Sequence, residues 1–401
     1  MSTNPFSKRR KIVHDNDTIH RELLDFDFDK VCLVTLDSTN VYCCLVCGKN
    51  FQGRSKSSPA YNHAITLNHH KYLNLTSEKF YNLPEDVEVP KTHELQDIIE
   101  YLNPRYTRRD IELLPRVSFD LNSEKYLVGY VGLNNIKHND YANVVVQALA
   151  HVTPIRDHYL LLRNDDSLNG KFGQLVRKLW SPHLFKSHVS PQGFITAASE
   201  ESKKKFTTEK GNPKTFLLWL LNNLDGPFDC LRGAVEITST PIVPHEGNDK
   251  VEFVTLESKK RVTETKFWML SVDVPLTLFN TRGDKIEEID LEDLLAKYDG
   301  ETTTQGAKDI RTYRVTHLPE YVILLYERSK ESKTVVKFPD VLELNGKKYE
   351  LASSIRHKST WSIALKAEME WILIDNLEVK SLSSELLFLD ENYIQVWRLI
   401  Q

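Results

Sequence analysis

Residues 132–149 read Gly132-Leu-Asn-Asn-Ile-Lys-His-Asn-Asp140-Tyr-Ala-Asn-Val-Val-Val-Gln-Ala-Leu149. A polar turn leads directly into an apolar run of helical length, which predicts a buried helix that begins near Asp140. The free N–H groups and the dipole at the amino end of a helix stabilise negative charge, so this is a favourable place for a thiolate nucleophile. The residue that the turn delivers to this place is Asp140.

The composition excludes several classes of protein. The chain has 401 residues, enough for two domains, and a formal net charge of -4. A general nucleic-acid binder would carry a strong basic excess. No apolar run reaches 18 residues and the amino terminus has no apolar signal segment, so we expect neither a membrane span nor secretion.

The five cysteines favour a metal site over disulfides. Four of them lie within the first 47 residues, and the total is odd: Cys32, Cys43, Cys44, Cys47 and Cys230. An odd number without a signal segment is a poor disulfide framework. We therefore expect a reduced compartment and a metal site near the amino terminus, and we interpret Cys230 as a buried thiol.

Cys44 and Cys47 form a Cys-x2-Cys turn, and His63 and His69 follow it. Two thiolates and two imidazoles satisfy the tetrahedral preference of zinc. The five residues between the histidines place both rings on one side of a short helix and the turn after it. The sequence therefore predicts one structural zinc ion in a segment too small to bury a core alone.

Other interpretations of this region stay open. The two histidines could be incidental and the two cysteines buried thiols. Cys32, Cys43 and His70 are spare candidate ligands, and Cys32 or His70 could replace one of the four.

The chain divides into three predicted parts. Residues 1–25 are polar and aperiodic, which predicts a disordered basic tail; Lys8-Arg9-Arg10-Lys11 is a candidate nuclear localisation signal, or simply a solvated charge run. Residues 26–125 are predicted to hold the zinc finger and a linker, with a short amphipathic helix at 93–101. Its apolar side is formed by Leu95, Ile98, Ile99 and Leu102.

Residues 126–401 are predicted to form a larger α+β domain. Residues 215–224 have the composition of a buried helix, and residues 289–295 that of a short helix with acidic residues near its start. Three β-branched or aromatic runs predict strands, at 268–274, 321–326 and 349–352.

The stretch that begins at Gly132 resembles the cysteine box of the ubiquitin-specific proteases. Six residues match the box in register: Gly132, Leu133, Asn135, Tyr141, Asn143 and Gln147. The nucleophile position holds Asp140, the oxyanion-stabilising Asn position holds His138, and the flexible Gly position holds Lys137. The resemblance implies a papain-like fold with thumb, palm and fingers whose chemistry has been removed.

The other members of the expected triad are placed by the same resemblance. The strand Trp371-Ile-Leu-Ile-Asp375-Asn puts Asp375 at the position of the residue that orients the catalytic imidazole. Ser359-Thr360-Trp361 falls where the family has Gly-His-Tyr, so Thr360 occupies the histidine position. His357 could take its place only after a three-residue slip that reverses the faces of a strand. Without a thiolate and an imidazole, we expect no peptide-bond hydrolysis.

The amino-terminal region resembles the zinc finger of the ubiquitin-binding-protein (UBP) type, in Cys44-x2-Cys47-Gly48, Phe51-x-Gly53-Arg54 and His63-Ala64. Active relatives use such a finger to grip the free carboxyl terminus of ubiquitin. The usual second Cys-Gly-Arg segment is missing here, so the resemblance implies a structural zinc and argues against ubiquitin binding.

The finger and the altered box together resemble one branch, the U4/U6.U5 tri-snRNP-associated ubiquitin-hydrolase-like proteins. The closing run Glu391-Asn-Tyr-Ile-Gln-Val-Trp397 matches that branch as well. The resemblance implies a nuclear scaffold for pre-mRNA splicing that acts in U4/U6 and tri-snRNP assembly or maintenance. Its partners would be spliceosomal proteins, with indirect snRNA association and no membrane. The alternatives are a reader that binds ubiquitin without cutting it, and an active enzyme that uses an unrecognised residue.

Overall fold

The structure is a computed structural model. It describes residues 19–27, 30–163, 165–247, 250–276, 288–329, 332, 334–368, 370–388 and 391–400. The basic cluster Lys8-Arg9-Arg10-Lys11 lies outside the described residues, as does most of the predicted tail. No helix among the described residues is both long and apolar enough to cross a membrane.

The chain forms two compact units. Unit 1 contains residues up to 104, together with 118–125 and 181–187, and unit 2 contains residues 105–117, 126–180 and 188–401. Residues 105–117, which lie inside the predicted linker, thus belong to the second unit.

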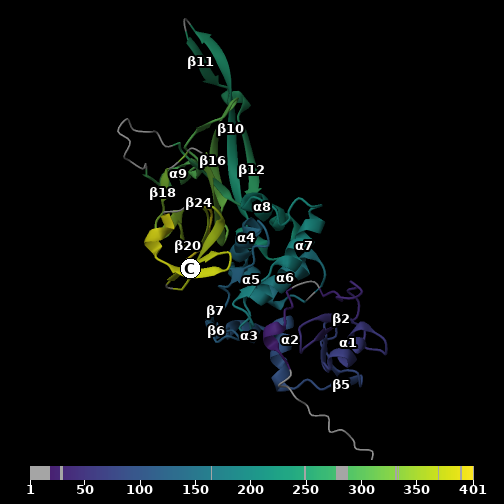
Figure 1. The fold of residues 1–401 in the computed structure, drawn as a ribbon. Coiled ribbons are helices and arrows are strands. Elements are labelled where there is room, and N and C mark those ends of the chain that lie inside the picture. The colour runs from purple at the N-terminus through teal and green to yellow at the C-terminus, as the bar shows by residue number, and fades with distance from the viewer. Residues whose placement is uncertain are drawn as a thin grey trace, which may run out of the picture. The chain divides into compact units, whose positions relative to one another are not determined.

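Unit 1 is built on a five-stranded antiparallel sheet with α1 (Pro59–Leu67) packed against β2 (Figure 1). The strand order is β2 (Asn50–Gln52), β1 (Val41–Cys44), β3 (Lys71–Asn74), β4 (Phe80–Asn82), β5 (Val87–Val89). The helix begins where the Ser58 hydroxyl accepts the Tyr61 N–H, and it ends at Asn68, whose φ of 57° is left-handed.

The predicted amphipathic helix is present. A 3-10 turn at His93–Leu95 continues into α2 (Gln96–Leu102). All four side chains predicted for its apolar side are buried: Leu95, Ile98, Ile99 and Leu102. The periodicity of this short segment therefore located both the helix and its buried face.

Residues 19–25 differ from the prediction of disorder. They contain a 3-10 turn at Arg21–Leu23, and Ile19 and Leu24 are buried. The His20 N–H donates to the Leu45 carbonyl at 3.0 Å. Because burial and hydrogen bonding fix this stretch in unit 1, the prediction is wrong for these residues.

Unit 2 contains a group of helices around α4 (Asp140–Ala150). This helix packs against α5 (Thr153–Leu161), α8 (Pro213–Asn223), β20 (Lys347–His357) and β21 (Trp361–Ala367). Every residue of α4 from Tyr141 to Ala150 is buried. The helix predicted at 215–224 is present as α8. The other helices of the group are α3 (Arg108–Glu112), α5 (Thr153–Leu161), α6 (Leu168–Leu179), α7 (Gln192–Glu201) and α8 (Pro213–Asn223).

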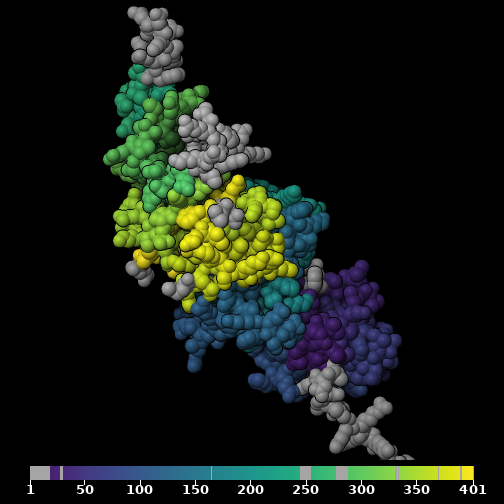
Figure 2. Space-filling view, turned by 60° about the vertical axis from the view of Figure 1, so that its left-hand side comes forward, coloured from purple at the N-terminus to yellow at the C-terminus, as the bar shows by residue number. Residues whose placement is uncertain are grey.

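A large sheet forms much of unit 2, and Figure 2 shows the residues of its last strands, in yellow, gathered on one face. Its order is β13 (Leu270–Val274), β17 (Tyr321–Arg328), β24 (Glu391–Leu399), β20 (Lys347–His357), β21 (Trp361–Ala367), β22 (Glu370–Asp375), β23 (Glu378–Leu382), with β19 (Val341–Leu344) also on β20. Among the described strands of this sheet, β13 and β17 are the only neighbours that pair in parallel. The predicted strands at 268–274, 321–326 and 349–352 all fall in this sheet.

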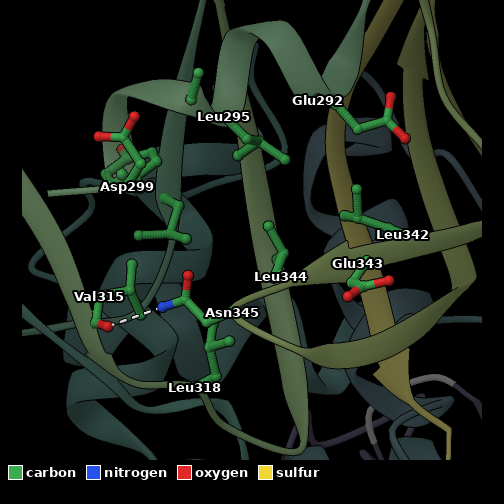
Figure 3. A pocket seen from close by; sticks show the side chains of 12 residues that line it. Glu292, Leu295, Asp299, Val315, Leu318, Leu342, Glu343, Leu344 and Asn345 are labelled. Carbon is green, nitrogen blue, oxygen red and sulfur yellow. Dashed lines mark hydrogen bonds between the residues drawn. The ribbon is translucent and has the colours of Figure 1, made fainter. Parts of the chain in front are cut away.

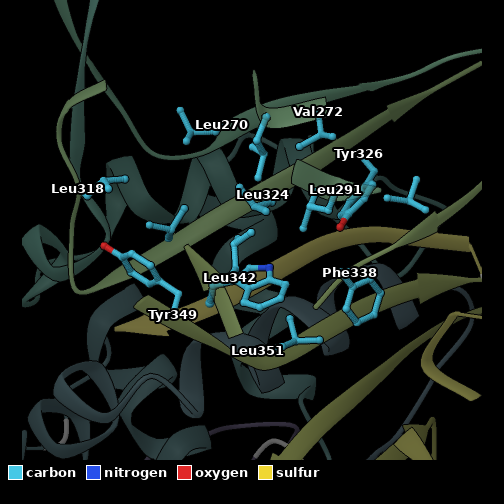
Figure 4. Packing of buried hydrophobic residues seen from close by; sticks show 14 of the residues in the cluster. Leu270, Val272, Leu291, Leu318, Leu324, Tyr326, Phe338, Leu342, Tyr349 and Leu351 are labelled. Atoms are coloured by element: carbon cyan, nitrogen blue, oxygen red, sulfur yellow. The ribbon is translucent and has the colours of Figure 1, made fainter. Parts of the chain in front are cut away.

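One face of this sheet carries a core of buried side chains, among them Val272, Leu324, Tyr326 and Trp397 (Figure 4). The segment predicted as a helix at 289–295 is divided here. Residues 288–290 form β14 (Glu288–Asp290), which pairs in parallel with β18 (Val335–Lys337), and only α9 (Leu291–Leu295) is helical. The long-range pairing of Ile289 with Val336 overrides the helical pattern.

A second sheet in unit 2 is organised around β10 (Gly233–Gly247), which spans 15 residues. The remaining members are β11 (Lys250–Thr255), β12 (Arg261–Phe267), β15 (Thr304–Gln305) and β16 (Asp309–His317). The short strands β8 (Gly132–Leu133) and β9 (His188–Val189) pair in parallel; β6 (Val117–Phe119) and β7 (Lys125–Leu127) complete the described strands. The predicted α+β class is confirmed.

Candidate functional site

The four predicted zinc ligands converge in unit 1. Cys44 ends β1, Cys47 follows in the next turn, His63 lies on α1, and His69 comes just after that helix. Their donor atoms all lie within 4.8 Å of one another. Cys47 Sγ is 3.4 Å from His63 Nε2, Cys44 Sγ is 3.5 Å from His69 Nδ1, and the two ring nitrogens are 3.1 Å apart.

This geometry fits a tetrahedral zinc ion. Zinc–sulfur and zinc–nitrogen bonds of about 2.3 and 2.0 Å in a tetrahedron place a sulfur and a nitrogen donor about 3.5 Å apart. The two sulfur–nitrogen distances agree with this spacing. The Phe51 ring stacks on His63 with 4.1 Å between centroids, which helps to orient that imidazole.

Burial favours the neutral forms of Cys44, His63 and His69. It raises the pKa of the Cys44 thiol to about 12 and lowers the pKa of both His63 and His69. Neutral imidazole is the metal-binding form, and a divalent cation stabilises the thiolates that burial disfavours.

The spare candidates lie outside this cluster. The Cys32 sulfur accepts the Val34 and Thr35 N–H groups at 3.4 and 3.5 Å. The His70 ring contacts the Leu83 carbonyl at 2.6 Å and the Asn68 amide oxygen at 2.9 Å. Among the described residues, the cluster positioned to hold a metal ion consists of Cys44, Cys47, His63 and His69.

In unit 2, buried amides shape the loop before α4. Asn139 is fully buried; its Oδ1 accepts the Ile136 N–H at 2.7 Å, and its Nδ2 donates to the Asn134 carbonyl at 3.1 Å and to Asn143 Oδ1 at 3.0 Å. Asn135 Oδ1 accepts the Asn139 N–H at 3.0 Å.

Amide side chains at intervals of four residues continue this arrangement into α4. Asn143 Nδ2 donates to the carbonyls of Leu133 and Asn134, and Gln147 Nε2 donates to the Val131 carbonyl at 2.7 Å. A spacing of four residues places these amides on one side of the helix. The sequence comparison had singled out Asn135, Asn143 and Gln147 but not Asn139, although the spacing of four includes it.

The carboxylate of Asp140 joins α4 to the start of β21. Asp140 is the first residue of α4, as predicted, and is half-buried. Its Oδ2 accepts the backbone N–H of Trp361 at 3.0 Å, and its Oδ1 accepts the Tyr141 N–H at 3.1 Å. The carboxylate therefore satisfies one backbone donor in α4 and one in β21, and the β21 donor lies 221 residues from Asp140 in sequence.

Thr360 and Asp375 also meet, as predicted. Thr360 Oγ1 lies 3.4 Å from Asp375 Oδ1, which also accepts the Asn376 amide at 2.9 Å. Burial raises the pKa of Asp375, the Thr360 hydroxyl opposes the rise, and the nearby Glu378 and Asp140 carboxylates add to it. Among the described residues, none of the hydrogen bonds to the Asp140 and Asp375 carboxylates comes from an imidazole.

Gly132 brings the loop close to Asp375. A Cβ at Gly132 would lie 2.7 Å from the Asn376 carbonyl oxygen, and the Leu133 N–H donates to that carbonyl at 3.1 Å. Only a glycine permits this approach.

The remaining predicted site residue, His138, is exposed, and its backbone N–H donates to the Thr208 carbonyl at 2.8 Å. Its neighbour Lys137 pairs with Glu209 at 2.9 Å at an exposed position. The structure thus brings Asp140, Thr360 and Asp375 together and leaves His138 at the surface.

Sequence reasoning missed a contact between α8 and β24. Asn212, which caps α8, exchanges side-chain hydrogen bonds with the Tyr393 hydroxyl at 2.9 and 3.1 Å. The Tyr393 ring lies 5.0 Å from that of Trp361, which in turn lies 4.4 Å from the ring of His357. No local pattern predicts this arrangement because its members come from distant segments.

Comparisons with known families agree with both units. The family described as "Zn-finger in ubiquitin-hydrolases and other protein" matches residues 30–94. The family described as "Ubiquitin carboxyl-terminal hydrolase" matches residues 131–395. The chain belongs to the ubiquitin carboxyl-terminal hydrolase family. Its amino-terminal unit is a UBP-type zinc finger, and the Cys44, Cys47, His63 and His69 side chains are positioned to bind the zinc.

Within this hydrolase family the chain belongs with relatives that are named for splicing. It is 36% identical to "Probable mRNA-splicing protein ubp10" of Schizosaccharomyces pombe, over 95% of this chain and 87% of the relative. It is 34% identical to "Pre-mRNA-splicing factor SAD1" of Saccharomyces cerevisiae, over 95% of this chain and 92% of the relative. The solved structure titled "Crystal structure of an essential yeast splicing factor" is 32% identical, with a TM-score of 0.80, over 96% of this chain and 99% of that one. The predicted order, a UBP-type finger followed by a ubiquitin-specific-protease fold, is confirmed.

Proposed function

We propose that this member of the hydrolase family is a non-catalytic scaffold in pre-mRNA splicing. In this proposal Asp140, His138, Thr360 and Asp375 occupy the positions of the nucleophile, the oxyanion-stabilising residue, the general base and the orienting residue. The observation that carries the proposal is the Asp140 carboxylate, which accepts the Trp361 N–H at the amino end of α4. A carboxylate engaged in this way is a poor nucleophile toward an amide, and Thr360 cannot act as a general base.

The splicing role is supported by the relatives named as splicing factors, which match nearly the whole chain. We propose that the protein acts in the nucleus, in U4/U6 and tri-snRNP assembly or maintenance. Its partners are spliceosomal proteins, and its association with snRNA is indirect. The net charge of -4 is consistent with protein partners rather than with direct, non-specific RNA binding.

The zinc finger is proposed to serve as a second protein contact rather than as a ubiquitin-binding site. Arg54 forms an ion pair with Asp86, and its guanidinium lies 4.6 Å from the centre of the Tyr81 ring. Because Asp86 already neutralises Arg54, this arginine offers little positive charge to a free carboxyl terminus. Two modest interfaces on one chain raise the effective concentration of each for the same particle.

Affinity purification tests this function. The tagged protein is purified from nuclear extract at moderate salt, and the co-purifying proteins and small RNAs are identified. We expect U4, U5 and U6 RNAs together with their proteins. Recovery of ubiquitinated proteins without these RNAs would instead support the ubiquitin reader.

A further inference from the structure

One buried tyrosine hydroxyl in unit 1 differs from the others in the described structure. Six described tyrosines are less than 2% exposed: Tyr72, Tyr141, Tyr159, Tyr321, Tyr326 and Tyr349. Five of their hydroxyls are hydrogen-bonded; those of Tyr159 and Tyr349, for example, donate to the Asp225 and Pro319 carbonyls at 2.9 and 2.8 Å. The Tyr72 hydroxyl has no hydrogen-bond partner of ordinary geometry.

A buried polar group without a partner is costly, and folded proteins contain few of them. Even a half-buried amide follows this rule in the pocket lined by α9 and β19, where Asn345 Nδ2 donates to the Val315 carbonyl at 2.9 Å (Figure 3). The Tyr72 hydroxyl therefore calls for a specific explanation.

The register of the sheet in unit 1 places Tyr72 beside the zinc cluster. Tyr72 on β3 lies directly opposite Cys44 on β1. Side chains in such a pair project from the same face of the sheet, with their Cβ atoms about 5 Å apart. The Tyr72 ring also meets the His63 ring edge-on, with 6.4 Å between centroids. Tyr72 thus lies next to one sulfur and one imidazole of the zinc cluster.

The electrostatics of Tyr72 agree with this position. Burial raises the pKa of its hydroxyl, and the neighbouring Cys44 sulfur raises it further. The hydroxyl therefore keeps its proton and remains a hydrogen-bond donor. A neutral thiol is a weak acceptor, whereas the charged sulfur of a metal-bound cysteine accepts a strong hydrogen bond.

We propose that Tyr72 is a positioning residue of the zinc site, whose hydroxyl donates a hydrogen bond to Cys44 Sγ when that sulfur binds zinc as a thiolate. Groups that hydrogen-bond to metal ligands orient them and tune the affinity for the metal. Zinc binding would then supply the partner that the Tyr72 hydroxyl lacks, and so couple the metal to the buried core of unit 1. The inference does not rest on the splicing role.

The first test is the zinc affinity of the purified full chain, measured by competition with a zinc-binding indicator dye. Tyr72→Phe removes the hydroxyl and keeps the ring. We expect this variant to bind zinc at least about tenfold more weakly. A Tyr72→Phe protein that binds zinc as tightly as the original would overturn the proposal.

The matched control is Tyr42→Phe, which removes a hydroxyl from the same apolar cluster of unit 1. Tyr42 is buried as well, but its ring packs edge-on against Tyr81, with 5.7 Å between centroids. The control is expected to bind zinc like the original protein. An equal loss in the control would assign the effect to the packing of the core and overturn the proposal.

Cobalt(II) in place of zinc provides a readout that a purely structural role of Tyr72 would not change. A hydrogen bond to a thiolate lowers the energy of the sulfur lone pairs, so its loss moves the sulfur-to-cobalt charge-transfer absorption to longer wavelength. We expect this shift in Tyr72→Phe loaded with one cobalt per chain, and no shift in Tyr42→Phe. An unchanged absorption in Tyr72→Phe would overturn the proposal even if the zinc affinity fell.

Discussion

The zinc cluster of unit 1 is assembled from residues 44–69, whereas the centre around Asp140 in unit 2 brings together residues as far as 221 positions apart. The two sites also differ in the chemical groups that they contain. In the zinc cluster, all four donors of a complete ligand set lie within 4.8 Å of one another. Around Asp140, the side chains that shape the loop are in place, while carboxylate and hydroxyl groups occupy the proposed reactive positions. The zinc ligands also hold a small unit together, whereas a nucleophile contributes nothing to folding. A catalytic centre can therefore lose its reactive groups and keep the fold around them. A structural metal site cannot lose its ligands without losing the fold that depends on the metal.

Removal of a zinc ligand is expected to have the largest effect. Because the metal-binding free energy of a small finger, about 10 kcal/mol, is also its folding free energy, Cys44→Ser is expected to abolish zinc binding and unfold unit 1. Zinc content and limited proteolysis report these two changes.

The neighbouring Cys43→Ser is the matched control, because Cys43 is buried but lies outside the ligand cluster. It is expected to retain one zinc per chain. A Cys44→Ser protein that also retains one zinc would contradict the assigned ligand set.

Loss of the buried amide before α4 comes next. Asn139→Ala removes three side-chain hydrogen bonds and takes from the Ile136 N–H and from the buried Asn143 Oδ1 the partner that Asn139 supplies. We expect the free energy of unfolding of unit 2 to fall by about 2–4 kcal/mol, measured by chemical denaturation. The control is Asn222→Ala, at an exposed position on α8, with an expected change within about 0.5 kcal/mol. Equal effects of the two substitutions would mean that the Asn139 side chain does not stabilise the loop before α4.

The Asp140 carboxylate is expected to contribute less, because it is only half-buried. Asp140→Ala leaves the Trp361 N–H without its acceptor, and we expect a loss of about 1 kcal/mol. Asp140→Asn keeps an oxygen acceptor and should cost less, as measured by the same denaturation experiment. An Asp140→Ala protein as stable as the original would mean that this carboxylate does not hold α4 to β21.

The smallest expected effect is the pH dependence that Asp375 contributes. Its pKa is raised in the folded protein, so the native state binds the proton more tightly than the unfolded state does. The stability from this group is fully present below the unfolded pKa and is lost as the pH rises through the folded pKa. Asp375→Asn should therefore be slightly more stable than the original protein at pH 7, with the difference vanishing in acid. A variant that is less stable at pH 7 would contradict the direction of this shift.

Local sequence patterns were sufficient for much of this architecture. Composition predicts helix α8 and three strands of the large sheet, the polar turn before an apolar run predicts the start of α4 near Asp140, and spacing predicts the four zinc ligands. The pairing of Ile289 with Val336 and the burial of Ile19 and Leu24 depend on distant partners, so no local pattern contains them. The same reason applies to the Asp140–Trp361 and Asn212–Tyr393 contacts. Asn139 is different, because it lies at the same four-residue spacing as Asn135, Asn143 and Gln147. That spacing would have identified it as a member of the amide row.

The most direct test of the central claim is hydrolysis of a fluorogenic amide at the carboxyl terminus of ubiquitin by the purified full chain. We predict no release of the fluorophore above the level of the Asp140→Ala variant. Turnover by the original protein that Asp140→Ala abolishes would contradict the claim that the centre has kept its framework and lost its chemistry.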